Sequence, residues 1–212
     1  MNELVKKLKK NKVRNIFTLE EAKSLKLKDN SFDFLLDEAI KNEWIDNIYK
    51  NIYTLRWKEC NTPSVSLYYL AQVFDPDCYV STMFVLSDYD WIPEYGCNVS
   101  CITTGEEKII DTNKYGRFIY RKLYDRYISA GIYEKREGNQ KYRMAKPLRA
   151  LCDLIYQRNE KIEYIGSVYD ALRLEWEYLE ALKKKDINEL KGKFGIDIIE
   201  YFLEDLERRI KL

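Results

Sequence analysis

Apolar residues near the N-terminus first recur at helical spacing and then alternate with polar ones, which predicts helices followed by a β-hairpin. Residues 2–10 place Leu4, Val5 and Leu8 on one side of a helix, with lysines around the rest. The phrases FTLEEAKSLKL and SFDFLLDEAIKNEW predict two more helices, and IDNIYKNIYTL alternates as a pair of short strands does. This order over residues 1–58 predicts a winged helix-turn-helix domain.

Polar residues mark where the second and third predicted helices begin. Thr18 can accept a hydrogen bond in the first turn of the second helix while Glu21 reaches back to it, which is a capping box. Asn30 or Ser31 is the expected cap of the third helix. Caps and periodicity therefore predict the same helix-turn-helix.

Beyond the linker-like phrase ECNTP, helical and alternating patterns mix, which predicts a second domain. Residues 64–158 combine apparent helices, such as KPLRALCDLIYQ, with strand patterns in CNVSCITT, KIIDT and RFIYRKLYDRYI. Residues 159–212 predict a helical extension packed on that domain, and YIGSVYDALRLEWEYLEALKKKD keeps helical spacing throughout. The expected fold class is α+β: an N-terminal winged helix-turn-helix, then a mixed α/β domain with C-terminal helices.

The charge of the chain is balanced overall but uneven along its length. Its 36 basic and 35 acidic residues give a net charge of +1. Residues 1–58 hold 13 basic and 9 acidic side chains, whereas residues 159–212 hold 10 basic and 13 acidic ones. The N-terminal region is thus the positive end of the chain.

The composition excludes several kinds of chemistry. The chain has no histidine, which removes serine-triad, histidine-ligated zinc and imidazole acid–base sites. Its five cysteines are irregularly spaced and odd in number, which favours a reducing compartment. The start shows no apolar leader, and no apolar run approaches about 18 residues, so we expect a cytoplasmic protein. We expect no cofactor, no metal and no enzymatic activity.

The predicted third helix carries the wrong charge for reading DNA. Its predicted buried stripe is Phe32, Leu35, Leu36, Ala39 and Ile40. Its opposite face holds Asp33, Phe34, Asp37, Glu38 and Lys41. Phosphates repel acidic groups, and helices that enter the major groove usually present Arg, Lys, Asn or Gln. The domain is therefore either a DNA-binding module or a winged helix used for protein contact.

Lysines of the first helix favour the DNA-binding alternative, because a basic run can hold phosphates without reading sequence. Lys50 is the one cation of the hairpin turn. The expected phosphate contacts are Lys6, Lys9, Lys10 and Arg14. Base contacts would fall to Asn30, Ser31 and Lys41, and the hairpin could add Tyr49, Lys50 and Asn51.

Three other clusters carry weaker signals. Arg117, Arg121 and Arg126 alternate with tyrosines and could form a surface for a protein partner, or one wet face of a sheet. Asp90, Glu106 and Lys108 loosely imitate the two carboxylates and the lysine of a magnesium-dependent nuclease. Cys97 and Cys101 match no common zinc spacing and are more typical of a core strand.

Three phrases together resemble the antitoxins of type IV abortive-infection toxin–antitoxin systems, the AbiEi-like family. They are NIYTL at the end of the hairpin, YVSTMFVL from Tyr79, and LRALCDLIY from Leu148, and the resemblance covers roughly residues 15–157. Asn51 stands where that family has glycine at the hairpin turn, and it can serve there because asparagine tolerates positive φ. Leu148 and Arg149 replace a Glu-Lys pair.

The resemblance implies a transcriptional regulator that binds double-stranded DNA at its own promoter. It also implies a partner, a nucleotidyltransferase-type toxin that the second domain counteracts. A protein-contact module and, less strongly, a metal nuclease remain as alternatives.

Overall fold

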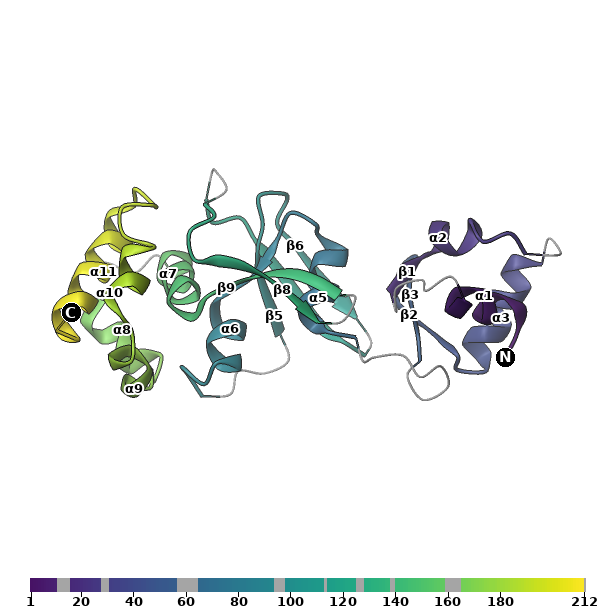
Figure 1. Ribbon diagram of the computed structural model, residues 1–212, viewed down its shortest axis with the longest axis horizontal. Coiled ribbons are helices and arrows are strands. Elements are labelled where there is room, and N and C mark those ends of the chain that lie inside the picture. The colour runs from purple at the N-terminus through teal and green to yellow at the C-terminus, as the bar shows by residue number, and fades with distance from the viewer. Residues whose placement is uncertain are drawn as a thin grey trace. The chain divides into compact units, whose positions relative to one another are not determined.

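The computed structural model describes residues 1–10, 16–27, 31–56, 65–93, 98–112, 114–124, 128–137, 140–158 and 165–211. Two compact units are present, one of residues 1–67 with 112–115 and one of residues 68–111 with 116–212. Each unit contains helices and its own sheet (Figure 1), so the predicted α+β class is confirmed.

Among its described residues, the N-terminal unit packs three helices on a three-stranded antiparallel sheet. Its elements are α1 (Glu3–Lys10), β1 (Ile16–Thr18), α2 (Leu19–Lys23), α3 (Phe32–Lys41), β2 (Ile45–Tyr49) and β3 (Ile52–Leu55). The strand order is β1-β3-β2, with β3 in the centre. Strand β1 was not expected from the sequence, because three residues are too few to show a period. The apolar sides of α1 and α3 close the core over this sheet.

The predicted capping box at the start of α2 is confirmed. The Glu21 amide donates to the Thr18 hydroxyl at 3.1 Å, and the Thr18 amide donates to the Glu21 carboxylate at 2.7 Å. Thr18 is extended, so the chain passes from β1 into α2 without an intervening loop.

The C-terminal unit contains a mixed six-stranded sheet of order β6-β7-β5-β4-β9-β8. Its strands are β4 (Tyr79–Val80), β5 (Asn98–Ile102), β6 (Lys108–Thr112), β7 (Gly116–Arg121), β8 (Ile132–Glu137) and β9 (Gln140–Ala145). Strand β4 pairs antiparallel with β5 and parallel with β9, so it joins the two halves of the sheet. Strands β4 and β8 were not expected, since β4 is very short and β8 is largely exposed.

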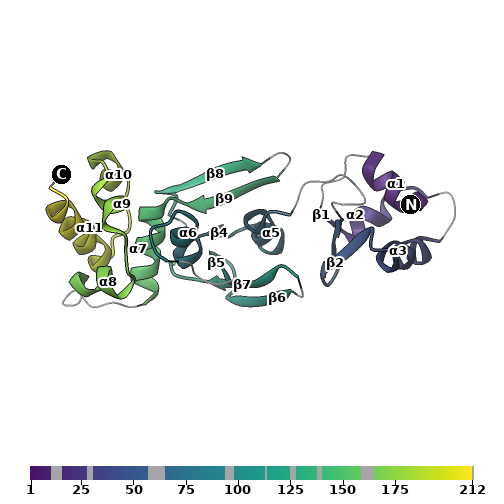
Figure 2. The same cartoon turned by 90° about the horizontal axis from the view of Figure 1, so that it is seen from below.

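Three helices accompany the sheet: α5 (Leu67–Phe74), α6 (Thr82–Asp88) and α7 (Pro147–Gln157). Figure 2 shows β8 and β9 on one side of α5 and α6, and β5, β6 and β7 on the other. The Gln72 amide of α5 donates to the Arg143 carbonyl of β9 at 3.1 Å, and the Tyr120 hydroxyl of β7 donates to the Ala71 carbonyl at 2.8 Å. Helix α5 is therefore bonded to both halves of the sheet.

The C-terminal segment forms α8 (Ile165–Ala171), α9 (Trp176–Glu180), α10 (Lys184–Asn188) and α11 (Asp197–Arg209). The expected continuous helix is interrupted between α8 and α9, where Arg173 has a φ of +50°. There the Glu175 amide donates to the Trp91 carbonyl at 2.9 Å, a bond outside the helix. A tertiary contact thus ends a helix that periodicity alone predicts to continue.

Candidate nucleic-acid interface

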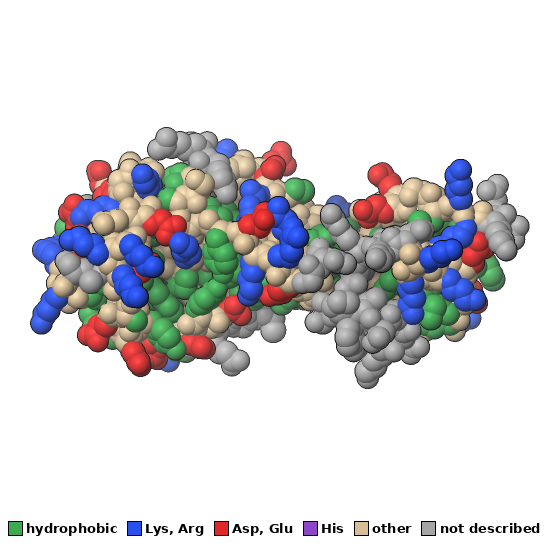
Figure 3. All heavy atoms as spheres, viewed as in Figure 1, with side chains coloured by type: hydrophobic (Ala, Val, Ile, Leu, Met, Phe, Trp, Pro, Cys, Tyr) green, Lys and Arg blue, Asp and Glu red, His purple; other side chains and the backbone are tan. Residues whose placement is uncertain are grey.

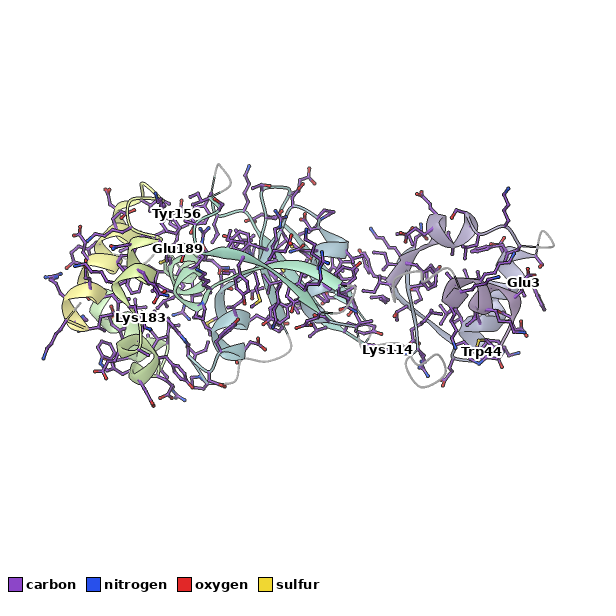
Figure 4. All side chains as sticks on the ribbon, viewed as in Figure 1. Glu3, Trp44, Lys114, Tyr156, Lys183 and Glu189 are labelled. Carbon is purple, nitrogen blue, oxygen red and sulfur yellow. The ribbon has the colours of Figure 1, made fainter. Side chains whose placement is uncertain are left out.

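Helix α1 directs its positive charge outward. Lys6 and Lys10 are exposed and, being four residues apart, lie on the same face of the helix. Lys7 is partly neutralised by Glu3, with 3.1 Å between the ammonium and the carboxylate, and Lys9 is half-buried. Figure 3 shows basic side chains among acidic ones on the visible face of the N-terminal unit, and Figure 4 labels Glu3. Lys6 and Lys10 are therefore the accessible charges of this helix.

The side chain of Asn2 joins α1 to α3 by hydrogen bonds, in addition to the apolar packing between the two helices. Its carbonyl oxygen accepts the Val5 amide at 3.1 Å and so caps the first turn of α1. Its amide nitrogen donates to the Leu35 carbonyl at 2.7 Å and to the Glu38 carboxylate at 3.0 Å. The lysine row of α1 consequently has a defined position relative to α3.

Helix α3 exposes an acidic face with an aromatic side chain on it. Phe34 is 70% exposed, and Asp33, Asp37 and Lys41 are exposed around it. Ile40 was expected in the buried stripe, which is wrong: it is 37% exposed. The buried part of the helix is narrower than predicted and includes Leu36 and Ala39. The outer face of α3 is therefore acidic and apolar rather than basic.

The hairpin of β2 and β3 turns at Lys50 and Asn51. Lys50 has a φ of +46°, so the expectation that Asn51 takes the positive φ is wrong. The side-chain amide of Asn47 donates to the Lys50 carbonyl at 2.8 Å, which holds Lys50 in this conformation. The Lys50 ammonium lies 5.1 Å from the centre of the Tyr49 ring, a cation–π contact. The hairpin thus presents an ammonium lying against an aromatic ring, with the exposed Asn51 beside it.

The remaining expected DNA contacts are placed only in part. Ser31 stands at the start of α3, half-buried, and its hydroxyl makes no capping bond to that helix. Lys41 is exposed in the last turn of α3. Asn30 and Arg14 lie outside the described residues. Within the described part of the N-terminal unit, the expected cations are therefore on α1, at the end of α3 and at the hairpin turn.

The arginines predicted to meet a partner are paired with carboxylates. Arg117 lies 2.6 Å from Asp111, which raises the pKa of the exposed Arg117 guanidinium. Arg121 lies 3.3 Å from Glu107. Arg126 lies outside the described residues. The positive charges of Arg117 and Arg121 are therefore largely balanced by carboxylates of neighbouring segments.

A buried polar cluster forms where two of the family-like phrases meet. Asp153, on α7, accepts the hydroxyls of Tyr79 at 3.0 Å, Ser81 at 2.6 Å and Tyr124 at 2.7 Å. Arg149, one turn earlier, lies 2.9 Å from the same carboxylate, and both side chains are fully buried. The phrase beginning YVS and the phrase LRALCDLIY are therefore joined by hydrogen bonds inside the C-terminal unit.

The cluster leaves Arg149 with little capacity for other partners. Its guanidinium donates to the Ile128 carbonyl at 3.1 Å, the Ala130 carbonyl at 2.7 Å and the Tyr79 hydroxyl at 2.7 Å, and it lies 4.7 Å from the Phe194 ring centre. Burial raises the pKa of the Tyr79 hydroxyl well above its ordinary value. These groups are enclosed and hydrogen-bonded to one another, which is typical of a network that stabilises the fold.

The nuclease-like residues are not assembled as a metal site would require. The Lys108 ammonium lies 3.1 Å from the buried Asp75 carboxylate, which also accepts the Thr103 hydroxyl at 3.0 Å. Glu106 is exposed between β5 and β6, and Asp90 follows α6 with a φ of +60°. Among the described residues, no three Cys, Asp or Glu side chains are grouped so that they could hold a metal ion.

Three cysteines, Cys78, Cys101 and Cys152, are buried thiols. Burial raises the pKa of the Cys101 and Cys152 thiols, which keeps them protonated and poorly nucleophilic. Cys60 and Cys97 lie outside the described residues. The described thiols therefore fill the core, which agrees with the prediction that Cys101 lies in a core strand.

The accessible features of the N-terminal unit are thus a basic row on α1, an acidic and aromatic face on α3, and a lysine at the hairpin turn. No helix among the described residues is long and apolar enough to cross a membrane. No protein-family model matches the chain, and no curated protein matches it either.

Proposed function

We propose that the chain is a non-enzymatic, antitoxin-like transcriptional regulator whose N-terminal unit is a winged helix-turn-helix bound to promoter DNA. The order helix, strand, two helices and hairpin, on a sheet with β3 in its centre, supports the winged-helix interpretation. The observation that carries the proposal is the exposed pair Lys6 and Lys10, fixed on the core by Asn2.

The binding proposed here is mainly electrostatic. Lys6 and Lys10 would contact phosphates, with Lys50 adding a contact from the hairpin. The acidic face of α3 is unfavourable in the major groove, because Asp33 and Asp37 are repelled by the phosphates. Affinity should therefore depend steeply on salt, and sequence preference should be modest.

A mobility-shift titration at several salt concentrations tests this proposal. Affinity falls as salt rises, so the slope of log affinity against log salt is negative. We expect it to be shallower by about 1.8 in the K6Q/K10Q variant, since each phosphate contact contributes about 0.9. K193Q, which removes an exposed cation of the C-terminal unit, is the matched control and should leave the slope unchanged. The proposal is overturned if the wild-type chain shows no preference for its own promoter over random duplex at low salt.

The antitoxin part of the proposal concerns the C-terminal unit and rests on the family-like phrases. A nucleotidyltransferase-type reading frame beside this one, and rescue of growth when both are expressed, would support it. Because Arg117 and Arg121 are paired with Asp111 and Glu107, a toxin bound there must offer carboxylates that replace these partners. R117E/R121E should then weaken the complex, whereas an unchanged complex would place the toxin elsewhere.

One observation favours a second function, a protein-contact module without DNA binding. Phe34 is 70% exposed on the acidic face of α3, and such an aromatic side chain is typical of an interface core. The D33N/D37N variant separates the two functions. If α3 approaches DNA, neutralising both carboxylates should tighten DNA binding. If neither the wild-type chain nor this variant binds DNA, the protein-contact function is favoured.

A further inference from the structure

A half-open cavity of about 280 Å³ lies in the C-terminal unit, where the first turn of α7 meets the segment around α10. Its lining includes the aromatic residues Trp91 and Tyr133 and the aliphatic residues Leu182 and Leu190. Trp91 is 6% exposed and Leu190 only 2%, so the deep part of the cavity is well covered. Figure 3 shows hydrophobic side chains reaching the surface of this unit beside charged ones.

The polar groups around this cavity already have partners, and the Asp186 carboxylate, which also lines it, accepts the Lys183 backbone amide at 2.9 Å. At the rim, the Lys146 ammonium lies 2.6 Å from the Glu189 carboxylate, which Figure 4 labels near α7. The hydroxyls of Tyr89 and Tyr133 form a short hydrogen bond. Arg149 also borders the cavity, but its guanidinium is bound within the buried cluster. The cations Lys146 and Arg149 are therefore both paired with carboxylates, and Asp186 is the lining carboxylate whose partner is a backbone amide.

Gly131, one of the lining residues, packs closely against Leu190 and Arg149. A methyl group at this position would lie 2.6 Å from Leu190 Cδ2 and 2.7 Å from Arg149 Cβ, closer than carbon atoms approach. The backbone of Gly131 is also at a φ of +70°, which favours glycine. The strand that begins β8 can therefore pass directly under Leu190 only because residue 131 has no side chain.

We propose that this cavity binds an uncharged aromatic molecule, a single ring or a fused pair of rings about the size of indole. Its volume lies just below the range for ligand sites, about 300–1,000 Å³, which limits the ligand to a small one. Trp91 and Tyr133 both line the cavity, and aromatic side chains favour contact with an aromatic ligand. An anionic ligand would lose its hydration without gaining a free positive charge, and a cationic one would meet only the hydrogen-bonded Asp186 carboxylate, so both bind less well.

Three probes with the same ring and different charge test the ligand class: indole, the anion indole-3-acetate and the cation tryptamine. Binding of each to the full chain is measured by ligand-observed NMR titration. We expect indole to bind about tenfold more tightly than either charged probe, because only indole enters without leaving an unpaired charge. Equal or tighter binding of a charged probe overturns the proposed class, and absence of indole binding overturns the site.

Blocking variants test the location. L190W should fill the deep part of the cavity and abolish indole binding. L182W should do the same from the rim, so the test remains decisive if L190W does not fold. I109W adds a tryptophan to a residue that is 54% exposed on β6, and it serves as the control. Unchanged indole affinity in a folded blocking variant would place the binding elsewhere and overturn the proposal.

Discussion

Arg149 brings a full positive charge into the interior of the C-terminal unit, and its neighbours show what such a residue requires. Asp153 supplies the counter-charge, two carbonyls and the Tyr79 hydroxyl accept three further N–H groups, and Phe194 covers the guanidinium. Removing one partner of a buried ion pair costs about 3–5 kcal/mol, because the remaining charge stays uncompensated. The residues of this cluster are therefore needed for the stability of the C-terminal unit.

Gly131, next to this cluster, gives a prediction at the residue scale. G131A should reduce the free energy of unfolding by more than about 1 kcal/mol, because the new methyl group would clash with Leu190 and Arg149 and the φ of residue 131 is positive. G192A is the matched control: Gly192 has a φ of +73° but no atom within 4 Å of the added carbon. Urea denaturation compares the two, and equal losses would show that backbone strain alone is responsible.

Single residues were predictable where their partners are close in sequence. Thr18 and Glu21 are three positions apart, and their reciprocal bonds follow from a local pattern. The cluster around Asp153 was missed, since Tyr79 lies 74 positions away and no periodicity connects the two. A signal was present in LRALCDLIY, where an arginine and an aspartate four apart interrupt an apolar helix.

At the scale of elements, helices with a clear stripe were predictable and very short strands were not. Helices α1, α3, α7 and α11 follow the spacing of their apolar residues. The break between α8 and α9 depends on a bond from Glu175 to the Trp91 carbonyl, which local sequence does not encode. The lysine row of α1 was predictable, but the direction in which its charges point depends on packing.

The start of α2 gives the prediction at this scale. T18A should destabilise the N-terminal unit by about 1 kcal/mol, because the Glu21 amide loses its acceptor. T18S keeps the oxygen and is the control. Amide hydrogen exchange across α2 measures the effect locally. Equal protection in T18A and T18S would mean that packing, rather than the cap, holds this helix.

At the scale of the whole molecule, the free energy of unfolding should fall at alkaline pH, because buried thiols and a buried tyrosine hydroxyl stay protonated in the folded chain. Burial raises the pKa of the Cys101 and Cys152 thiols and of the Tyr79 hydroxyl. In the unfolded chain the thiols ionise near about pH 8.5, while in the folded chain they stay protonated. Their contribution is therefore fully present below about pH 8.5 and is lost as the pH rises above it.

Urea denaturation between about pH 7.5 and about pH 9.5 checks this dependence, with up to about 1.4 kcal/mol lost per pH unit for each thiol. C152A removes one of these thiols and should give a shallower decline than the wild-type chain. A decline of the same steepness in C152A would show that Cys152 does not ionise on unfolding.

The two-residue strand β4 has a consequence for the order of folding. Hairpin β8–β9 forms between neighbouring segments, but the sheet becomes continuous only when Val80 pairs with both Cys101 and Met144. Contacts between distant segments form late, because closing long loops is entropically costly. The two halves of the sheet are therefore expected to form separately and to join in a last, slow step at Tyr79 and Val80.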